Sequence, residues 1–160
     1  FKVLDRAGKL RKKIAPGKKA QAVEWLDANT LIYAAQDAAE PEFRKTYVIR
    51  YDRATDREKL LYATREGGEV YQMNWARDRA GLVLGGRDRL AEAQELRRGI
   101  VILDMRAEDS PMTMYELNVF KPALFYDDAT LIFQTDRDRA GKVVPKTDTG
   151  VLASYDTVSG

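Results

Sequence analysis

The strongest constraint on the fold is an internal repeat of about 50 residues. Trp25, Trp75 and Phe125 follow one another at intervals of 50 residues, and each precedes a polar turn and an apolar segment. A fixed period of this length is typical of proteins built from one repeated supersecondary unit. Such a unit buries its apolar face only against its neighbours, so the repeat predicts a stack of similar units.

A second landmark recurs with nearly the same period. It is an aspartate that closes a short strand-like segment, and it occurs at intervals of 52 residues as Asp52, Asp104 and Asp156. Because two independent landmarks agree on the period, chance similarity does not explain it. The residues of an active site differ from the repeat pattern, whereas the residues of a structural turn recur in every repeat unit. We therefore interpret the three aspartates as hairpin caps and not as catalytic acids.

Each repeat contains four short segments with strand character. In the middle repeat these segments are Val70–Trp75, Leu82–Leu84, Ile100–Leu103 and Met112–Leu117. Short apolar or β-branched runs between Gly, Asp and Pro turn signals are typical of antiparallel strands. The sequence therefore predicts antiparallel hairpins in every repeat.

The segments between the strands have turn chemistry of their own. The tetrapeptide Asp-Arg-Ala-Gly occurs at Asp5–Gly8, Asp78–Gly81 and Asp138–Gly141. Its glycine can take the positive φ that a tight turn requires. The longer segment Gly85–Arg98 is expected to be a polar loop, in which only Leu90–Arg98 is rich in helix-forming residues and predicts a short helix.

Four-stranded units of this length are the blades of a β-propeller, so we predict an all-β fold with about three blades. The segment after each Trp or Phe landmark is expected to be buried on both faces, and Trp25 and Trp75 to lie in the core. Three blades do not close a ring. We expect a ring of about six to eight blades, completed by the rest of a longer chain or by a second copy. The single propeller region 1–160 divides into the end of one blade (1–19), two blade repeats (20–66 and 67–117) and a partial blade (118–160).

Residues in all three repeats resemble a known family. Leu131–Asp138 is similar to the apolar strand and Ser/Thr-Asp-Arg-Asp element of the TolB-type, WD40-like (PD40) propeller repeats. Phe125–Asp128 and Trp75–Asp78 stand where that family has Trp-Ser-Pro-Asp-Gly, and Trp25–Asp27 matches more loosely. The proline of that box is missing in all three copies. The resemblance implies a β-propeller in the periplasm or cell envelope of a bacterium.

The composition excludes several kinds of catalysis. The chain has no histidine and no cysteine, so Ser-His-Asp and Cys-His nucleophilic sites are excluded, as are metal sites built from these residues. Carboxylates are the remaining candidates for acids and bases. Asp136, Asp138 and Gly141 form a fragment of a calcium loop, but the glutamate that such a loop needs downstream is missing. We therefore predict no catalytic residue, no metal and no cofactor within this chain.

Charge is unevenly placed along the chain. The net charge is +2, and residues 1–20 carry eight basic side chains against Asp5 alone, that is +7, which leaves −5 for the remainder. No aromatic residue after Phe1 is interleaved with these cations, so a base-stacking surface and nucleic-acid binding are not expected. No segment approaches the roughly 20 apolar residues that a membrane-spanning helix needs.

A cluster of charged residues, most of it beside the long loop, is the candidate interaction site. Arginine is favoured at protein interfaces because its planar guanidinium donates several hydrogen bonds. The predicted partner-binding residues are Arg87, Asp88, Arg89, Arg97, Arg98 and Arg137. The leading hypothesis is a non-catalytic propeller scaffold that binds a protein partner. Two alternatives remain open. One is the propeller (gating) domain of a prolyl-oligopeptidase-type serine peptidase whose catalytic domain lies outside this chain, and the other is a carbohydrate-active propeller hydrolase or lyase.

Overall fold

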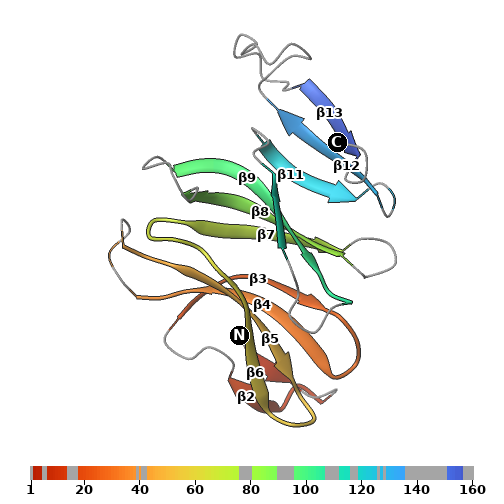
Figure 1. The fold of residues 1–160 in the computed structure, drawn as a ribbon. Helices are drawn as coiled ribbons and strands as arrows, with labels where there is room; N and C mark the ends of the chain where they lie inside the picture. The colour runs from red at the N-terminus through yellow and green to blue at the C-terminus, as the bar shows by residue number, and fades with distance from the viewer. Residues whose placement is uncertain are drawn as a thin grey trace.

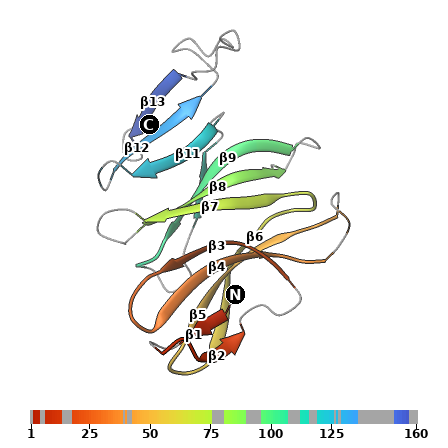
Figure 2. The ribbon, with the colours of Figure 1, turned by 180° about the vertical axis from the view of Figure 1, so that it is seen from behind.

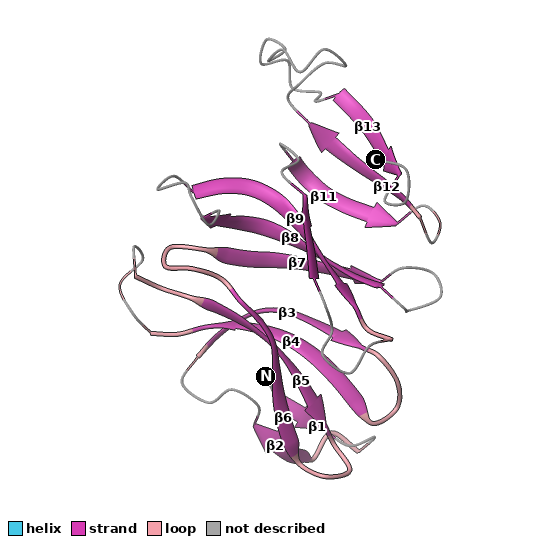
Figure 3. Ribbon diagram, in the orientation of Figure 1, coloured by secondary structure: helices cyan, strands magenta, loops and turns pink. Residues whose placement is uncertain are grey.

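The computed structural model is built from antiparallel β-sheets (Figures 1 and 3). It describes residues 2–4, 7–13, 18–38, 40, 43–75, 81–89, 96–106, 112–115, 119–125, 127, 129–135 and 151–156. Within this part of the chain the strands form one two-stranded sheet, two four-stranded sheets and one three-stranded sheet, which we name A, B, C and D in chain order.

The strands of each sheet follow one another along the chain. Sheet A contains β1 (Lys2–Leu4) and β2 (Leu10–Lys13). Sheet B contains β3 (Lys19–Trp25), β4 (Thr30–Gln36), β5 (Thr46–Asp52) and β6 (Arg57–Ala63). Sheet C contains β7 (Glu69–Trp75), β8 (Gly81–Arg89), β9 (Leu96–Asp104) and β10 (Met112–Tyr115). Sheet D contains β11 (Val119–Phe125), β12 (Thr130–Thr135) and β13 (Val151–Asp156).

The sheets are stacked with their faces toward one another (Figures 1 and 2). The first strand of sheet C, β7, lies against β3 of sheet B and also against β11 of sheet D. After the last strand of sheet B or C, the next strand along the chain is the first strand of the following sheet. The sequence repeat of about 50 residues therefore corresponds to one sheet and its connection.

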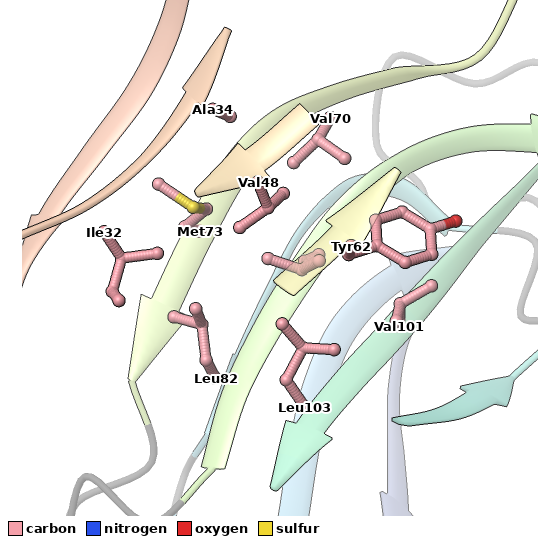
Figure 4. Close-up of a cluster of buried hydrophobic side chains, with 10 residues drawn as sticks. Ile32, Ala34, Val48, Tyr62, Val70, Met73, Leu82, Val101 and Leu103 are labelled. Atoms are coloured by element: carbon pink, nitrogen blue, oxygen red, sulfur yellow. The ribbon is translucent and has the colours of Figure 1, made fainter. Parts of the chain in front are cut away.

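The main apolar core lies between sheets B and C, where side chains of the two sheets point toward one another (Figure 4). Sheet B contributes Ile32, Ala34, Val48 and Tyr62, and sheet C contributes Val70, Met73, Leu82, Leu84, Val101 and Leu103. Removing these apolar groups from water stabilises the stack by about 25 cal/mol per Å² of buried surface. The alternation of side chains along each strand places them on one face.

Strand β4 is buried on both faces, which confirms the prediction from its apolar sequence. Burial is continuous along the whole strand. Ile32 and Ala34 face sheet C, whereas Leu31 and Tyr33 belong to a second buried cluster on the opposite face. In β12 fully and partly buried residues alternate, so only one face of that strand is completely covered.

The region predicted as a long polar loop is different in the structure. Gly85–Arg89 continue β8 and Leu96–Arg98 begin β9, so the loop and helix predictions are wrong for these residues. The backbone ladder of β8 and β9 runs from Gly81 opposite Asp104 to Arg89 opposite Leu96. Cross-strand hydrogen bonding overrides the local helix propensity of Leu96–Arg98. The remainder of the predicted helix, residues 90–95, lies outside the described residues.

The expectation that both tryptophans lie in the core is correct only in part. Trp75 is partly buried and packs against the core between sheets B and C. Trp25 is 45% exposed, so its assignment to the core is wrong. Trp25 lies on β3, on the face of sheet B that points away from sheet C, because it is paired with Leu31. No described strand of the chain packs over β3 on that side.

The turn chemistry is confirmed at one of the Asp-Arg-Ala-Gly sites. Gly8 has a φ of 76°, the left-handed conformation that favours glycine. Residues 78–80 and 138–141 of the other two sites lie outside the described residues. The part of the chain that the structure describes contains no helix long and apolar enough to cross a membrane.

Candidate functional site

Five of the six predicted partner-binding residues come together at one end of the β8–β9 hairpin. The backbone register places Arg87 opposite Arg98 and Asp88 opposite Arg97, and it pairs Arg89 with Leu96. The sixth, Arg137, lies outside the described residues. Residues separated by seven to eleven positions in the sequence are thus brought into direct opposition, and we call their positions the arginine hairpin (Arg87–Arg89 and Leu96–Arg98).

The arginine hairpin extends beyond the strands on either side of it. Strand β7 pairs with β8 only as far as Arg87, and β10 pairs with β9 only as far as Ile100. Among the described strands, Asp88 and Arg89 therefore pair only with β9, and Leu96–Gly99 pair only with β8. β8 and β9, with 9 residues each, exceed the 7 residues of their neighbour β7.

The register places charged residues opposite one another across the hairpin and across to β7. Like charges directly opposite one another destabilise an antiparallel pair, and the register places Arg87 opposite Arg98. Asp88 opposite Arg97 is a favourable combination, and Glu69 of β7 stands opposite Arg87 on the other side. The register thus combines two opposite-charge pairs with one like-charge pair.

A second group of polar side chains, made of tyrosines and the carboxylates they bind, lies on the face of sheet B that points away from sheet C. The hydroxyl of Tyr33 donates a hydrogen bond to Glu58 at 2.9 Å, and the hydroxyl of Tyr51 donates one to Asp56 at 2.9 Å. Sequence reasoning missed this group, although the alternation of Tyr47, Ile49 and Tyr51 on β5 places them on one face.

Two lysines complete this tyrosine-rich face. The Lys12 ammonium of β2 lies 4.6 Å from the centre of the Tyr51 ring and forms an ion pair with Asp56. The Lys18 ammonium lies 4.7 Å from the centre of the Tyr47 ring. A cation over an aromatic face is attracted by the ring quadrupole. The contacts of Lys12 hold sheet A against the β5–β6 side of sheet B (Figure 2).

The tyrosines on this face act as hydrogen-bond donors. Burial raises the pKa of Tyr33 well above its usual value, and the hydrogen bond to Glu58 raises it further. Burial also raises the pKa of Tyr47, with a further contribution from the Asp37 carboxylate. Both phenols therefore remain protonated at neutral pH, which suits them to donate to carboxylates and not to act as bases. The arrangement accounts for packing on this face of sheet B.

The sequence predicts that the three recurring aspartates cap turns, and the hydrogen bonds of two of them confirm it. Asp52 accepts hydrogen bonds from the backbone N–H and the hydroxyl of Thr55, and Asp104 accepts them from the backbone N–H and the guanidinium of Arg106. These bonds favour the charged form and lower the pKa of both carboxyls. The cap interpretation of Asp52 and Asp104 is confirmed. The third landmark, Asp156, is the last residue of β13.

Two further aspartates of this kind were missed. Asp27 accepts hydrogen bonds from the backbone N–H groups of Asn29 and Thr30, and Asp127 accepts them from Ala129 and Thr130. The two aspartates are 100 residues apart, and each stands three residues before a threonine that opens a strand. That spacing was the available signal, because an aspartate cap bonds the N–H groups two and three residues later.

No site for a metal ion was found among the residues that the structure describes, since no three acidic side chains there gather closely enough to hold one. The calcium-loop fragment at Asp136, Asp138 and Gly141 lies outside them. The chain matches no model of a known protein family. A search of curated proteins found no relative either.

Proposed function

We propose that this protein is a non-catalytic β-propeller scaffold that binds a protein partner through the arginine hairpin. The observation that carries the proposal is the β8–β9 register, which brings Arg87, Asp88, Arg89, Arg97 and Arg98 to a projecting hairpin end. Rigid sheets that present variable connections are a common platform for recognition. The fold supports binding by this projection without supplying chemistry of its own.

The propeller part of the proposal rests on the organisation of the sheets. Sheets B and C are each a meander of four antiparallel strands, and successive sheets stack with their first strands adjacent. This order, together with the 50-residue repeat, is what blades of a propeller require. The resemblance to TolB-type repeats supports the same fold and a location in the bacterial cell envelope.

The chemistry of the hairpin indicates what kind of surface it binds. Arginine binds carboxylates with two parallel hydrogen bonds, and it also donates to backbone carbonyl groups. Asp88 adds an acceptor within the same cluster. A folded protein surface with exposed carboxylates beside backbone or lysine donors fits this mixed pattern better than a uniformly charged polymer.

The proposal can be tested with a photo-crosslinking amino acid at Arg89 and, separately, at Arg97. The matched control carries it at Thr55, an exposed residue of the β5–β6 turn. In an extract of the source cells, we expect the hairpin positions to form an adduct with one discrete protein and the control to form none. Replacing Arg98 by Ala should reduce that adduct without lowering the melting temperature. Equal adducts at Thr55, or adducts indifferent to Arg98→Ala, would contradict the proposal.

A further inference from the structure

The three repeats define two different faces on every sheet. In register, Trp25 pairs with Leu31, Trp75 with Leu82 and Phe125 with Leu131. We call the face that carries these strand-two leucines the rear face, and the opposite one the front face. Between sheets B and C, the rear face of C (Leu82) packs on the front face of B (Ile32). The stack therefore joins a rear face to a front face.

The rear face of sheet B is covered only in part. At its centre Leu31 and Tyr33 are buried. At its edges, Trp25 is 45% exposed, Val23 is 42% exposed and Leu60 is 55% exposed. The register assigns all three to this face, because they pair with Leu31, Tyr33 and Ile49. Three large apolar side chains thus face solvent where the corresponding face of sheet C meets another sheet.

The front face of sheet D is exposed in a complementary way. Ile132 is the counterpart of Ile32 in sheet B, 100 residues later in the sequence. Leu152 is the counterpart of Val48, 104 residues later. Val48 is 0% exposed because sheet C covers it, whereas Leu152 is 74% exposed. Ile132 is only partly buried. Sheet D therefore presents an exposed apolar front face. A front face of this kind covers the rear face of sheet C, but among the described strands none covers the β3 side of the rear face of sheet B.

Strand edges are open at the same two places. Among the described strands, β1 pairs only with β2, and β13 pairs only with β12. Lys12 of β2 connects sheet A to Tyr51 and Asp56 on the β5–β6 side of sheet B, and the other long edge of sheet A is the open edge of β1. Open edges of this kind readily accept a further strand from another chain.

We propose that the front face of sheet D docks on the rear face of sheet B in a second copy of this chain. The contact reproduces the front-to-rear packing that sheets B and C already show, with Leu152 and Ile132 set against Trp25 and Val23. It is a head-to-tail contact, which closes into a ring when the rotation between copies allows it. In that ring, β13 of one copy lies beside β1 of the other. This association is independent of the arginine hairpin.

The first test is sedimentation velocity of the full chain over a range of concentrations. We expect a reversible species larger than the monomer, and its loss in Leu152→Glu and in Val23→Glu. The matched control is Phe43→Glu, because Phe43 is 58% exposed but lies in the β4–β5 connection and not on a strand of either face. Far-ultraviolet circular dichroism and thermal melting check that each variant folds. A wild-type chain that stays monomeric, or association that survives Leu152→Glu, overturns the proposal.

The second test uses the absence of cysteine from the chain. Chains that carry only Val23→Cys and chains that carry only Leu152→Cys are given different tags, mixed and oxidised. A head-to-tail contact predicts a mixed disulfide at least several-fold more abundant than that between Leu152→Cys and Phe43→Cys chains. Predominant disulfides between two Leu152→Cys chains would instead reveal a symmetric contact and overturn the arrangement.

Discussion

Replacing Leu82 by Ala tests the stacking on which the whole architecture depends. Leu82 is 0% exposed and lies between sheets B and C (Figure 4). A buried Leu→Ala change costs about 2–5 kcal/mol, because the transfer energy is lost and a cavity remains. The ladders on both sides restrict collapse of that cavity, so we expect about 3 kcal/mol. For a chain of this size, that corresponds to a fall in Tm of about 6–12 °C.

The assay is thermal and urea unfolding followed by circular dichroism at 218 nm, a wavelength at which strands absorb. The matched control is Leu152→Ala, which deletes the same atoms at a position that is 74% exposed. We expect the control to change the free energy of unfolding by less than about 0.5 kcal/mol at a concentration where the chain is monomeric. A similar, small loss in both variants would refute the packing of sheet C on sheet B.

Three other substitutions probe local features. Gly86→Ala places a Cβ at 1.9 Å from the backbone oxygen of Glu69, so β7 and β8 must separate; we expect a loss of about 3 kcal/mol or more in urea unfolding, and a loss below 1 kcal/mol would contradict the register. Tyr33→Phe removes the hydrogen bond to Glu58, and calorimetry should show a loss of about 1–2 kcal/mol; an unchanged Tm would argue against that bond. The lowered pKa of Asp52 implies stability that is present above its unfolded pKa, about 3.9, and lost as pH falls through the folded value. Asp52→Asn keeps the turn geometry and should make the fall in Tm between about pH 4 and 2 less steep. A fall as steep as that of the unsubstituted protein would count against the cap.

The strands and turns were largely predictable because their causes are local. The four apolar or β-branched segments of the middle repeat correspond to β7, β8, β9 and β10, although β8 and β9 are longer than expected. The hairpin caps at Asp52 and Asp104 were also predictable, since an aspartate side chain bonds the N–H groups that follow it. Each of these features depends on residues within a few positions of one another.

The residues of the candidate site were predictable from the sequence, but their arrangement in space was not. The clustering of arginines at 87–89 and 97–98 is visible in the sequence. Their opposition depends on a ladder that extends past the apolar part of β8 and β9, and the polar composition of those arms concealed it. The tyrosine–carboxylate pairs on sheet B were missed for a similar reason. Tyr33 and Glu58 are 25 residues apart and meet only when β4, β5 and β6 are aligned.

By itself, the sequence determined the all-β class, the 50-residue repeat and the order of strands within each sheet. These follow from the period of apolar residues and from turn chemistry, which act along the chain. Only the tertiary structure decided which faces are covered. Trp25 and Trp75 occupy equivalent places in their repeats, yet Trp25 is 45% exposed and Trp75 packs in the core. A side chain's burial depends on the neighbour that packs against it, and a repeat specifies the same face in every copy without specifying its neighbour.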